Sequence, residues 1–248
     1  MADKLLNTAE AARFLRVSQA SVRRWSDSGL LPARRVGRRR ERRFTEPDLQ
    51  RFLVPASPIP KTTHDGVQKQ VLVGGTALPL HSHVATFYNS DEGRLRLTIP
   101  FFREGLLRGQ PCFLAAGAEV LDAYMEALRN EEGVDIESAV RSGMFVAVAG
   151  PGEKVDSALA FWERALSNSL AAGPNLIRVV GEMRSERTLF VSDNEMISYE
   201  MAFNGIAKRF PTVTLCQYDV RAFDGEVLFH ALRAHPDLYE LGIASFLN

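Results

Sequence analysis

The stretch LNTAEAARFLRVSQASVRRW, residues 6–25, decides the fold of the first part of the chain. Thr8 is a suitable N-cap for a helix over residues 9–15, whose alanines, phenylalanine and leucine form one apolar face. Ser18 is a suitable N-cap for a second helix over residues 19–28. Only residues 16 and 17 separate the first helix from that cap, and this spacing predicts the tight turn of a helix-turn-helix.

A basic wing and a third helix are expected in the stretch that follows, GLLPARRVGRRRERRFTEPDLQRFL, residues 29–53. Gly37 lies near the tip of a two-stranded wing over residues 33–44, and Thr45 begins a helix that ends near Leu53. Guanidinium groups that lie close together repel one another, and a polyphosphate relieves the repulsion. The wing carries seven arginines within ten positions: Arg34, Arg35, Arg38, Arg39, Arg40, Arg42 and Arg43.

Charge is divided unevenly along the 248 residues, although the formal net charge is zero. Residues 1–54 hold 13 basic and six acidic side chains, which leaves 17 basic and 24 acidic side chains for the remainder. A basic first domain joined to an acidic body is expected to bind nucleic acid through one end only.

The second helix is expected to read double-stranded DNA. Its solvent side is expected to carry Gln19, Ser21, Arg23 and Arg24. Arginine and glutamine reach guanine and adenine edges in the major groove, and the alternative for these four is a solvated polar face. The wing residues expected to contact DNA are Arg35, Arg38, Arg39, Arg40, Arg42 and Arg43.

The rest of the chain predicts a linker and a larger domain. Residues 55–80 are expected to be the linker, because Pro55, Pro58 and Pro60 disfavour regular pairing. Residues 81–248 alternate strand and helix patterns, which is typical of an α/β domain with a mainly parallel sheet. Strands are expected at residues 84–88, 112–116, 144–148, 176–180 and 213–218.

Composition excludes several classes of protein. Hydrophobic residues make up 46% of the chain and charged residues 24%, as in ordinary globular proteins. No apolar run approaches the roughly 18 residues that span a bilayer, so we expect a cytoplasmic protein with no membrane partner. Two cysteines, Cys112 and Cys216, are too few for a disulfide scaffold, and buried inert thiols are the expected state.

Enzymatic activity is not expected. The chain has no G-x-x-x-x-G-K-[ST] loop, and the first strand of the larger domain is followed by Asn89-Ser90-Asp91-Glu92. Two carboxylates at that point would oppose a triphosphate. The sequence also shows no pair of a nucleophile and a general base, so we expect no catalytic residues and no cofactor. A nucleotide- or metal-dependent enzyme localised on DNA stays open as an alternative.

Polar residues at the ends of the strands are candidates for binding a small effector, because open α/β sheets place their pockets there. The candidates at strand ends are Tyr88, Asn89, Glu182, Gln217, Tyr218 and Asp219, and His83 and His235 are further candidates for the same pocket. Glu182 and Asp219 can instead form structural salt bridges with Arg184 or Arg221, and His235 can be a turn residue. A zinc or copper site formed by His81, His83, Cys216 and His235 is a further alternative.

Residues 6–53 resemble the MerR/excisionase-type winged helix-turn-helix. The resemblance rests on LNTAEAARFLRVSQASVRRW, GLLPARR and RRFTEPDLQRFL. It implies that Arg23 and Arg24 lie on the recognition helix and that Arg42 and Arg43 lie on the wing beside the phosphates. The chain departs from the family at Phe44, where a tyrosine is frequent, and a phenolic contact to phosphate would be lost there.

Residues 83–242 resemble the MEDS sensory domain of DcmR-like regulators. The matching stretches are HVATFYNSDE, IPFFREGLLRGQPCFL, RVVGEM, YEMAFN, CQYDVRAF and AHPDLYELG. The resemblance implies a RecA/KaiC-like α/β fold without a phosphate loop that senses a small molecule.

Together these patterns predict a DNA-binding transcription regulator with a small-molecule effector. A homodimer is expected, because one small head would bind a half-site weakly. An excisionase-like architectural DNA binder whose body contacts proteins is the remaining alternative.

Overall fold

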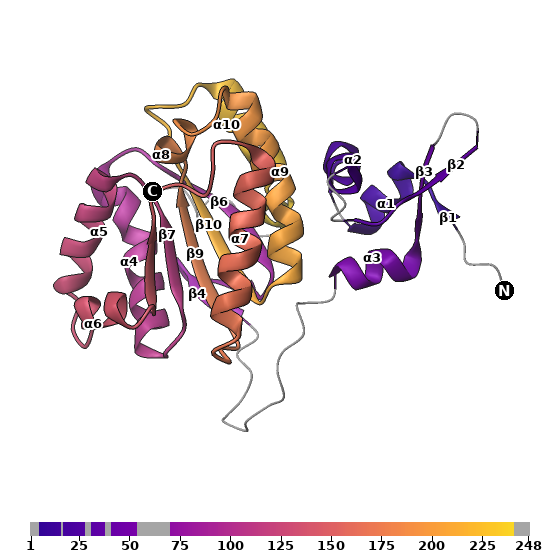
Figure 1. Cartoon of the computed structure of the whole chain (residues 1–248). Coiled ribbons are helices and arrows are strands. Elements are labelled where there is room, and N and C mark those ends of the chain that lie inside the picture. Colours follow the sequence, from indigo (N-terminus) through magenta and orange to yellow (C-terminus); the bar gives the residue numbers. More distant parts are fainter. Residues whose placement is uncertain (1–4, 16, 28–30, 38–40, 54–69, 241–248) are drawn as a thin grey trace.

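The computed structural model describes the chain except for residues 1–4, 16, 28–30, 38–40, 54–69 and 241–248. A small N-terminal unit, here called the head, is joined to a larger α/β unit, here called the body (Figure 1). The head consists of β1 (Leu5–Leu6), α1 (Thr8–Leu15), α2 (Gln19–Asp27), β2 (Arg34–Val36), β3 (Glu41–Thr45) and α3 (Glu46–Leu53).

Local side-chain caps define the starts of the helices in the head. Ser18 accepts the backbone N–H of Ser21 at 3.1 Å, and Thr45 accepts that of Asp48 at 3.2 Å, as expected. The first cap is not Thr8 but Asn7, whose side chain accepts two backbone N–H groups of the first turn. Glu10 in turn accepts the backbone N–H of Asn7 at 2.8 Å, which completes a capping box.

The wing is an antiparallel pair packed on the helices of the head. Arg34 lies opposite Arg43 and Arg35 opposite Arg42, and β1 pairs with the other edge of β3. The ring of Phe44 is fully buried in the core of the head. The other buried members of this core are Leu6, Ala11, Ala12, Leu15, Val22, Trp25, Leu31, Leu49 and Phe52.

The body contains the remaining elements. Its strands are β4 (Gln70–Val73), β5 (Thr76–Pro79), β6 (Ser82–Tyr88), β7 (Cys112–Ala115), β8 (Phe145–Val148), β9 (Ile177–Glu182) and β10 (Thr212–Asp219). Its helices are α4 (Asp91–Leu107), α5 (Ala118–Arg129), α6 (Ile136–Arg141), α7 (Val155–Leu170), α8 (Met183–Arg187), α9 (Asp193–Arg209) and α10 (Gly225–Ala234), followed by a short 3-10 turn, η1 (Pro236–Glu240).

A parallel sheet of five strands forms the centre of the body, in the order β6-β10-β9-β7-β8. Figure 1 shows α4, α5 and α6 on one side of the sheet and α7, α9 and α10 on the other. Both faces are covered, and β6, β9 and β10 are buried along their whole length. The α/β class and the parallel sheet are confirmed.

The last ten residues before position 80 in the expected linker range form part of the body. The expected range was 55–80, and residues 54–69 lie outside the described part of the chain. Residues 70–79 instead form the hairpin β4–β5. Val71, Val73 and Leu78 bury their side chains in the core of the body, so the hairpin belongs to that domain.

No helix in the described part of the chain is long and apolar enough to cross a bilayer.

Candidate functional site

A groove on the head gathers four of the residues expected to contact DNA. It has a volume of about 410 Å³ and lies between the starts of α1 and α2 and the wing. Gln19, Arg35, Arg42 and Arg43 line it together with the capping turn at Asn7. Glu41 also lines the groove and pairs with Arg43 at 2.8 Å, so three guanidinium groups and one carboxylate leave a net positive surface suited to phosphate groups.

Only some of the remaining DNA-contact candidates on the head belong to the described residues. Arg23 is exposed and donates a hydrogen bond of 3.3 Å to the side chain of Gln19, so both lie on the outer face of α2. The side chain of Arg24 and the wing residues Arg38, Arg39 and Arg40 lie outside the described residues.

The expectation that Ser21 faces solvent is wrong. Its side chain is 1% exposed, and its hydroxyl donates a hydrogen bond of 3.2 Å to the carbonyl oxygen of Met201 in α9. Trp25, one turn further along α2, packs against α9 at Gly205. Sequence patterns do not show this contact, because it joins residues 180 positions apart.

The contact between the head and α9 extends to α3. The guanidinium of Arg209 lies over the ring of Phe52, 5.7 Å from its centroid. A groove of about 640 Å³ lies between the head and the body. It is lined by α1 and α2 on one side and by Met201, Asn204 and Arg233 on the other. The helix expected to read DNA therefore touches the body directly through α9.

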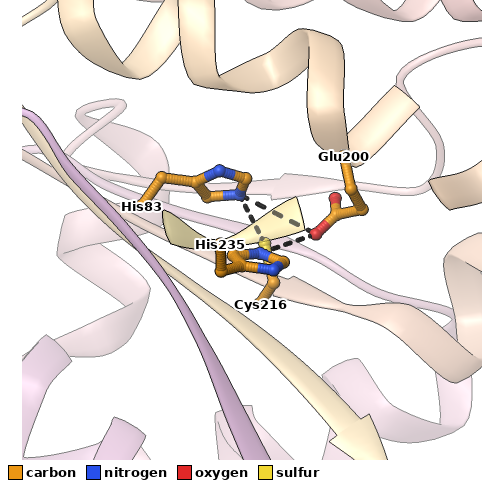
Figure 2. Close-up of side chains that lie close together, drawn as sticks. All are labelled: His83, Glu200, Cys216 and His235. Atoms are coloured by element: carbon orange, nitrogen blue, oxygen red, sulfur yellow. Dashed lines mark hydrogen bonds and ion pairs between the residues drawn. The ribbon is translucent and has the colours of Figure 1, made fainter. Parts of the chain in front are cut away.

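A buried polar cluster of four side chains lies between α9, the sheet and the end of α10, and it is here called the histidine cluster (Figure 2). It consists of His83 from β6, Glu200 from α9, Cys216 from β10 and His235 at the end of α10. The Nε2 atom of His83 is 3.1 Å from Cys216 Sγ and 3.8 Å from Glu200 Oε2. The Nε2 atom of His235 is 2.9 Å from the same Glu200 oxygen.

Burial governs the protonation of the histidine cluster. Burial, with His235 close by, lowers the pKa of His83 to about 3, so its imidazole is neutral. Burial opposes ionisation of Glu200, but contacts with His235 and His83 outweigh it and lower the pKa of the carboxyl below its usual range. Burial and the neighbouring Glu200 raise the pKa of the Cys216 thiol well above its usual value.

The candidates at the strand ends lie on both faces of the sheet. Successive side chains of a strand point to opposite faces, and Tyr218 donates to Glu200 at 3.1 Å on the α9 face. Gln217 lies on the other face, where it donates to the backbone carbonyl of Arg94 at 2.7 Å and accepts the hydroxyl of Tyr124. His83 and His235 contact the same Glu200 carboxyl group as Tyr218.

Glu182 and Asp219 have structural partners. Glu182 caps α8, where it accepts the backbone N–H groups of Arg184 at 3.2 Å and Ser185 at 2.9 Å. The hydroxyl of Tyr88 donates to Glu182 at 2.8 Å. Asp219 forms an ion pair of 2.8 Å with Arg221. The salt bridge considered for Asp219 is therefore present, and Asn89 is exposed.

Sequence reasoning missed Glu200 and included His81. His81 is half-buried at a left-handed turn with φ of 69° and does not belong to the histidine cluster. Glu200 lies on the buried face of a helix, between the buried residues Tyr199 and Ala202. A lone carboxylate on an apolar helix face is a signal that could have identified it, because buried carboxylates need partners.

Comparison with known proteins connects both units with a family. Residues 82–236 match the MEDS family model, described as the methanogen/methylotroph, DcmR sensory domain. The chain belongs to the MEDS family. Residues 5–53 of this MEDS-family chain match a helix-turn-helix domain model. The chain is also similar to the transcriptional repressor DcmR of Methylorubrum extorquens, with 35% identity in an alignment that covers 96% of this chain and 92% of the relative.

The matches confirm the expected combination of a helix-turn-helix with a sensory domain in a transcription regulator. They do not address the MerR type of the head or the expected homodimer, which stay predictions.

Proposed function

We propose that this protein is a transcriptional repressor in which the body controls DNA binding through α9. The observation that carries the proposal is the contact between the two units. Ser21 and Trp25 of α2 pack against α9, while Gln19 and Arg23 of the same helix point outward. Any shift of α9 therefore moves the helix that offers these two side chains to DNA.

The head binds DNA with two surfaces. Arg23 and Gln19 reach base edges in the major groove, and Arg35, Arg42 and Arg43 contact phosphates. The similarity to a repressor supports the direction of regulation. A homodimer on a repeated or palindromic site supplies the affinity that one small head lacks.

The body acts as a sensory module rather than as an enzyme. A small molecule in the groove between α2 and α9 would contact both units and change how the head docks. The head is either docked on α9 or released from it. An effector shifts the equilibrium between these two arrangements only by the difference between its affinities for them. The similarity to a repressor and the match to a sensory family support this reading.

Selection from random DNA duplexes by the full chain tests the proposal. We expect one enriched motif, and a promoter that overlaps it should be repressed in a reporter strain. Arg23→Ala should weaken binding to the motif by about 1–3 kcal/mol and affect random DNA much less. Arg129→Ala, an exposed arginine of the body, is the matched control. Without an enriched motif, or with equal losses on motif and random DNA, sequence-specific repression is excluded.

A further inference from the structure

The histidine cluster brings four atoms that commonly bind metals to one place. Two imidazole nitrogens, one thiol sulfur and one carboxylate oxygen all lie within 4.8 Å of one another (Figure 2). All four side chains are buried, and each comes from a different part of the body. A ligand held by these atoms would therefore fasten α9 and the end of α10 to the sheet.

Hydrogen bonds outside the cluster fix the tautomers of both histidines. The Nδ1 atom of His235 lies 2.7 Å from the carbonyl oxygen of Ala231, which can only accept, so Nδ1 carries the proton. The amide nitrogen of Asn204 donates to the carbonyl of Ala234 at 2.7 Å, so its oxygen accepts the Nδ1–H of His83 at 3.3 Å. The Nε2 atoms of both histidines thus face the cluster, and each carries a lone pair when its imidazole is neutral.

Four potential ligand atoms face one another inside the cluster. The hydroxyl of Tyr218 donates to Glu200 Oε2, and the thiol of Cys216 can donate to His83 Nε2 at 3.1 Å. The Nε2 atom of His235 lies 2.9 Å from Glu200 Oε2 without the alignment of a hydrogen bond, and it has no hydrogen-bond partner among the described residues. A carboxylate that faces this nitrogen is balanced by a proton on the imidazole or by a cation, and only a cation also binds His83 and Cys216.

We propose that His83, Glu200, Cys216 and His235 bind one zinc ion. The charges balance, because a thiolate and a carboxylate neutralise Zn²⁺ while the two imidazoles stay neutral. A tetrahedral zinc ion with bonds of about 2.0–2.3 Å holds its ligand atoms roughly 3.3–3.8 Å apart. The separations here begin at 2.9 Å and end within 4.8 Å, so small side-chain movements suffice. One sulfur with two nitrogens and an oxygen suits zinc better than cuprous copper, which prefers more sulfur.

The surroundings of the cluster match those of zinc sites. Ala231 and Asn204 orient the two imidazoles through Nδ1, and Tyr218 orients the carboxylate. When the bond between Cys216 Sγ and zinc forms, the S–H bond breaks and its proton leaves to solvent, without any redox change. Uptake of the ion therefore releases protons.

The zinc site goes beyond the proposed function and does not depend on it, because metal uptake is measured without DNA. The full chain is treated with a chelator, exchanged into clean buffer and titrated with Zn²⁺ by calorimetry and with Co²⁺ by absorption spectroscopy. We expect one ion per chain, and a near-ultraviolet thiolate-to-cobalt charge-transfer band. Cys216→Ser should abolish the band, and Glu200→Gln should weaken uptake of zinc at least about tenfold.

Two matched controls separate the cluster from other candidate ligands. Cys112→Ser changes the other buried thiol, and His230→Gln changes a partly exposed histidine of α10, the helix that ends at His235. Both controls should retain one ion per chain. Glu200→Gln keeps the size of the side chain, so circular dichroism should show a native fold even if Cys216→Ser does not fold. No stoichiometric uptake by the folded wild type, or uptake that Glu200→Gln leaves unchanged, would overturn the proposal.

Discussion

Gly205 in α9 lies against the indole of Trp25 in α2, and a Cβ atom at position 205 would lie 2.6 Å from the Cζ2 atom of that ring. The same Cβ would lie 3.1 Å from the ring of Phe52. Contacts of 2.6 Å do not occur between carbon atoms, so the close approach of the head depends on glycine at this position.

We predict that Gly205→Ala releases the head from α9. The added methyl group cannot coexist with the docked indole, and overpacking of this kind costs about 1–3 kcal/mol. Alanine favours the helix itself by about 1 kcal/mol, so α9 should stay folded. In a Trp162→Phe background, the fluorescence of Trp25 should shift to longer wavelength. Gly225→Ala, which meets no atom within 4 Å, is the control, and an unshifted spectrum for Gly205→Ala would contradict a tight contact.

A second prediction concerns phosphate contacts by the wing. Arg35 and Arg42 lie opposite each other in β2 and β3 and line the same groove. Each phosphate contact contributes about 0.9 to the slope of log affinity against log salt. Replacing both arginines with alanine should therefore reduce the slope by roughly two for any DNA sequence. Arg129→Ala in the body serves as the control, and a slope that stays at the wild-type value places the wing away from DNA.

A third prediction concerns the stability of the body. Arg178 in β9 is fully buried and donates to Gln110 at 2.8 Å and to Glu104 at 2.9 Å. Removing one partner of a buried charge pair costs about 3–5 kcal/mol, so Arg178→Ala should lower the free energy of unfolding by about that amount. Arg108 pairs with the same Glu104 from an exposed position, and Arg108→Ala should cost at most about 1 kcal/mol. Urea denaturation measures both, and equal losses would refute this assignment.

A fourth prediction is that the protein does not hydrolyse nucleotides. Ser90 caps α4 by accepting the N–H of Gly93, and Asp91 beside it forms an ion pair with Arg221. The turn after β6 therefore carries a carboxylate where a triphosphate would have to lie. ATP or GTP with magnesium should neither be turned over nor raise the melting temperature. Turnover that survives rigorous purification and disappears in Glu182→Gln would point to an enzyme instead.

A fifth prediction joins the zinc site to DNA binding. Glu200 and Met201 are neighbours in α9, the first facing the histidine cluster and the second contacting Ser21. Coupling between two sites in proteins is typically 1–3 kcal/mol. Zinc should therefore change the affinity of the wild type for its DNA motif by about fivefold or more, measured by fluorescence anisotropy. Glu200→Gln should not respond, and neither should Gly205→Ala. A response that persists in both variants would assign the effect of zinc to another site.

Short-range signals in the sequence predict the fold well. Ser18 and Thr45 act as caps because each accepts an N–H only three residues away. The buried strands are recognisable because parallel strands covered on both faces are almost continuously apolar. The sequence predicts Thr8 as the first cap, whereas the structure shows Asn7. Both residue types can accept the same N–H groups, so the pattern does not separate the two positions.

Long-range features could not be predicted in the same way. The burial of Ser21 depends on Met201, and the histidine cluster depends on strand order and on the pleat that separates Tyr218 from Gln217. Neither leaves a periodic pattern in the sequence. The sequence offered His83 and His235 as candidates, but it could not show which face of the sheet each residue joins, or that Glu200 completes the group.

The position of β10 in the sheet has a consequence for synthesis of the protein. This strand is the last of the sheet in the chain, yet it lies between β6 and β9. While a ribosome makes the protein, the body cannot close until residue 219 has emerged. The head needs only contacts within residues 5–53, so it folds first and quickly. A nascent chain thus carries a finished DNA-binding surface while the helix that restrains it is still being synthesised.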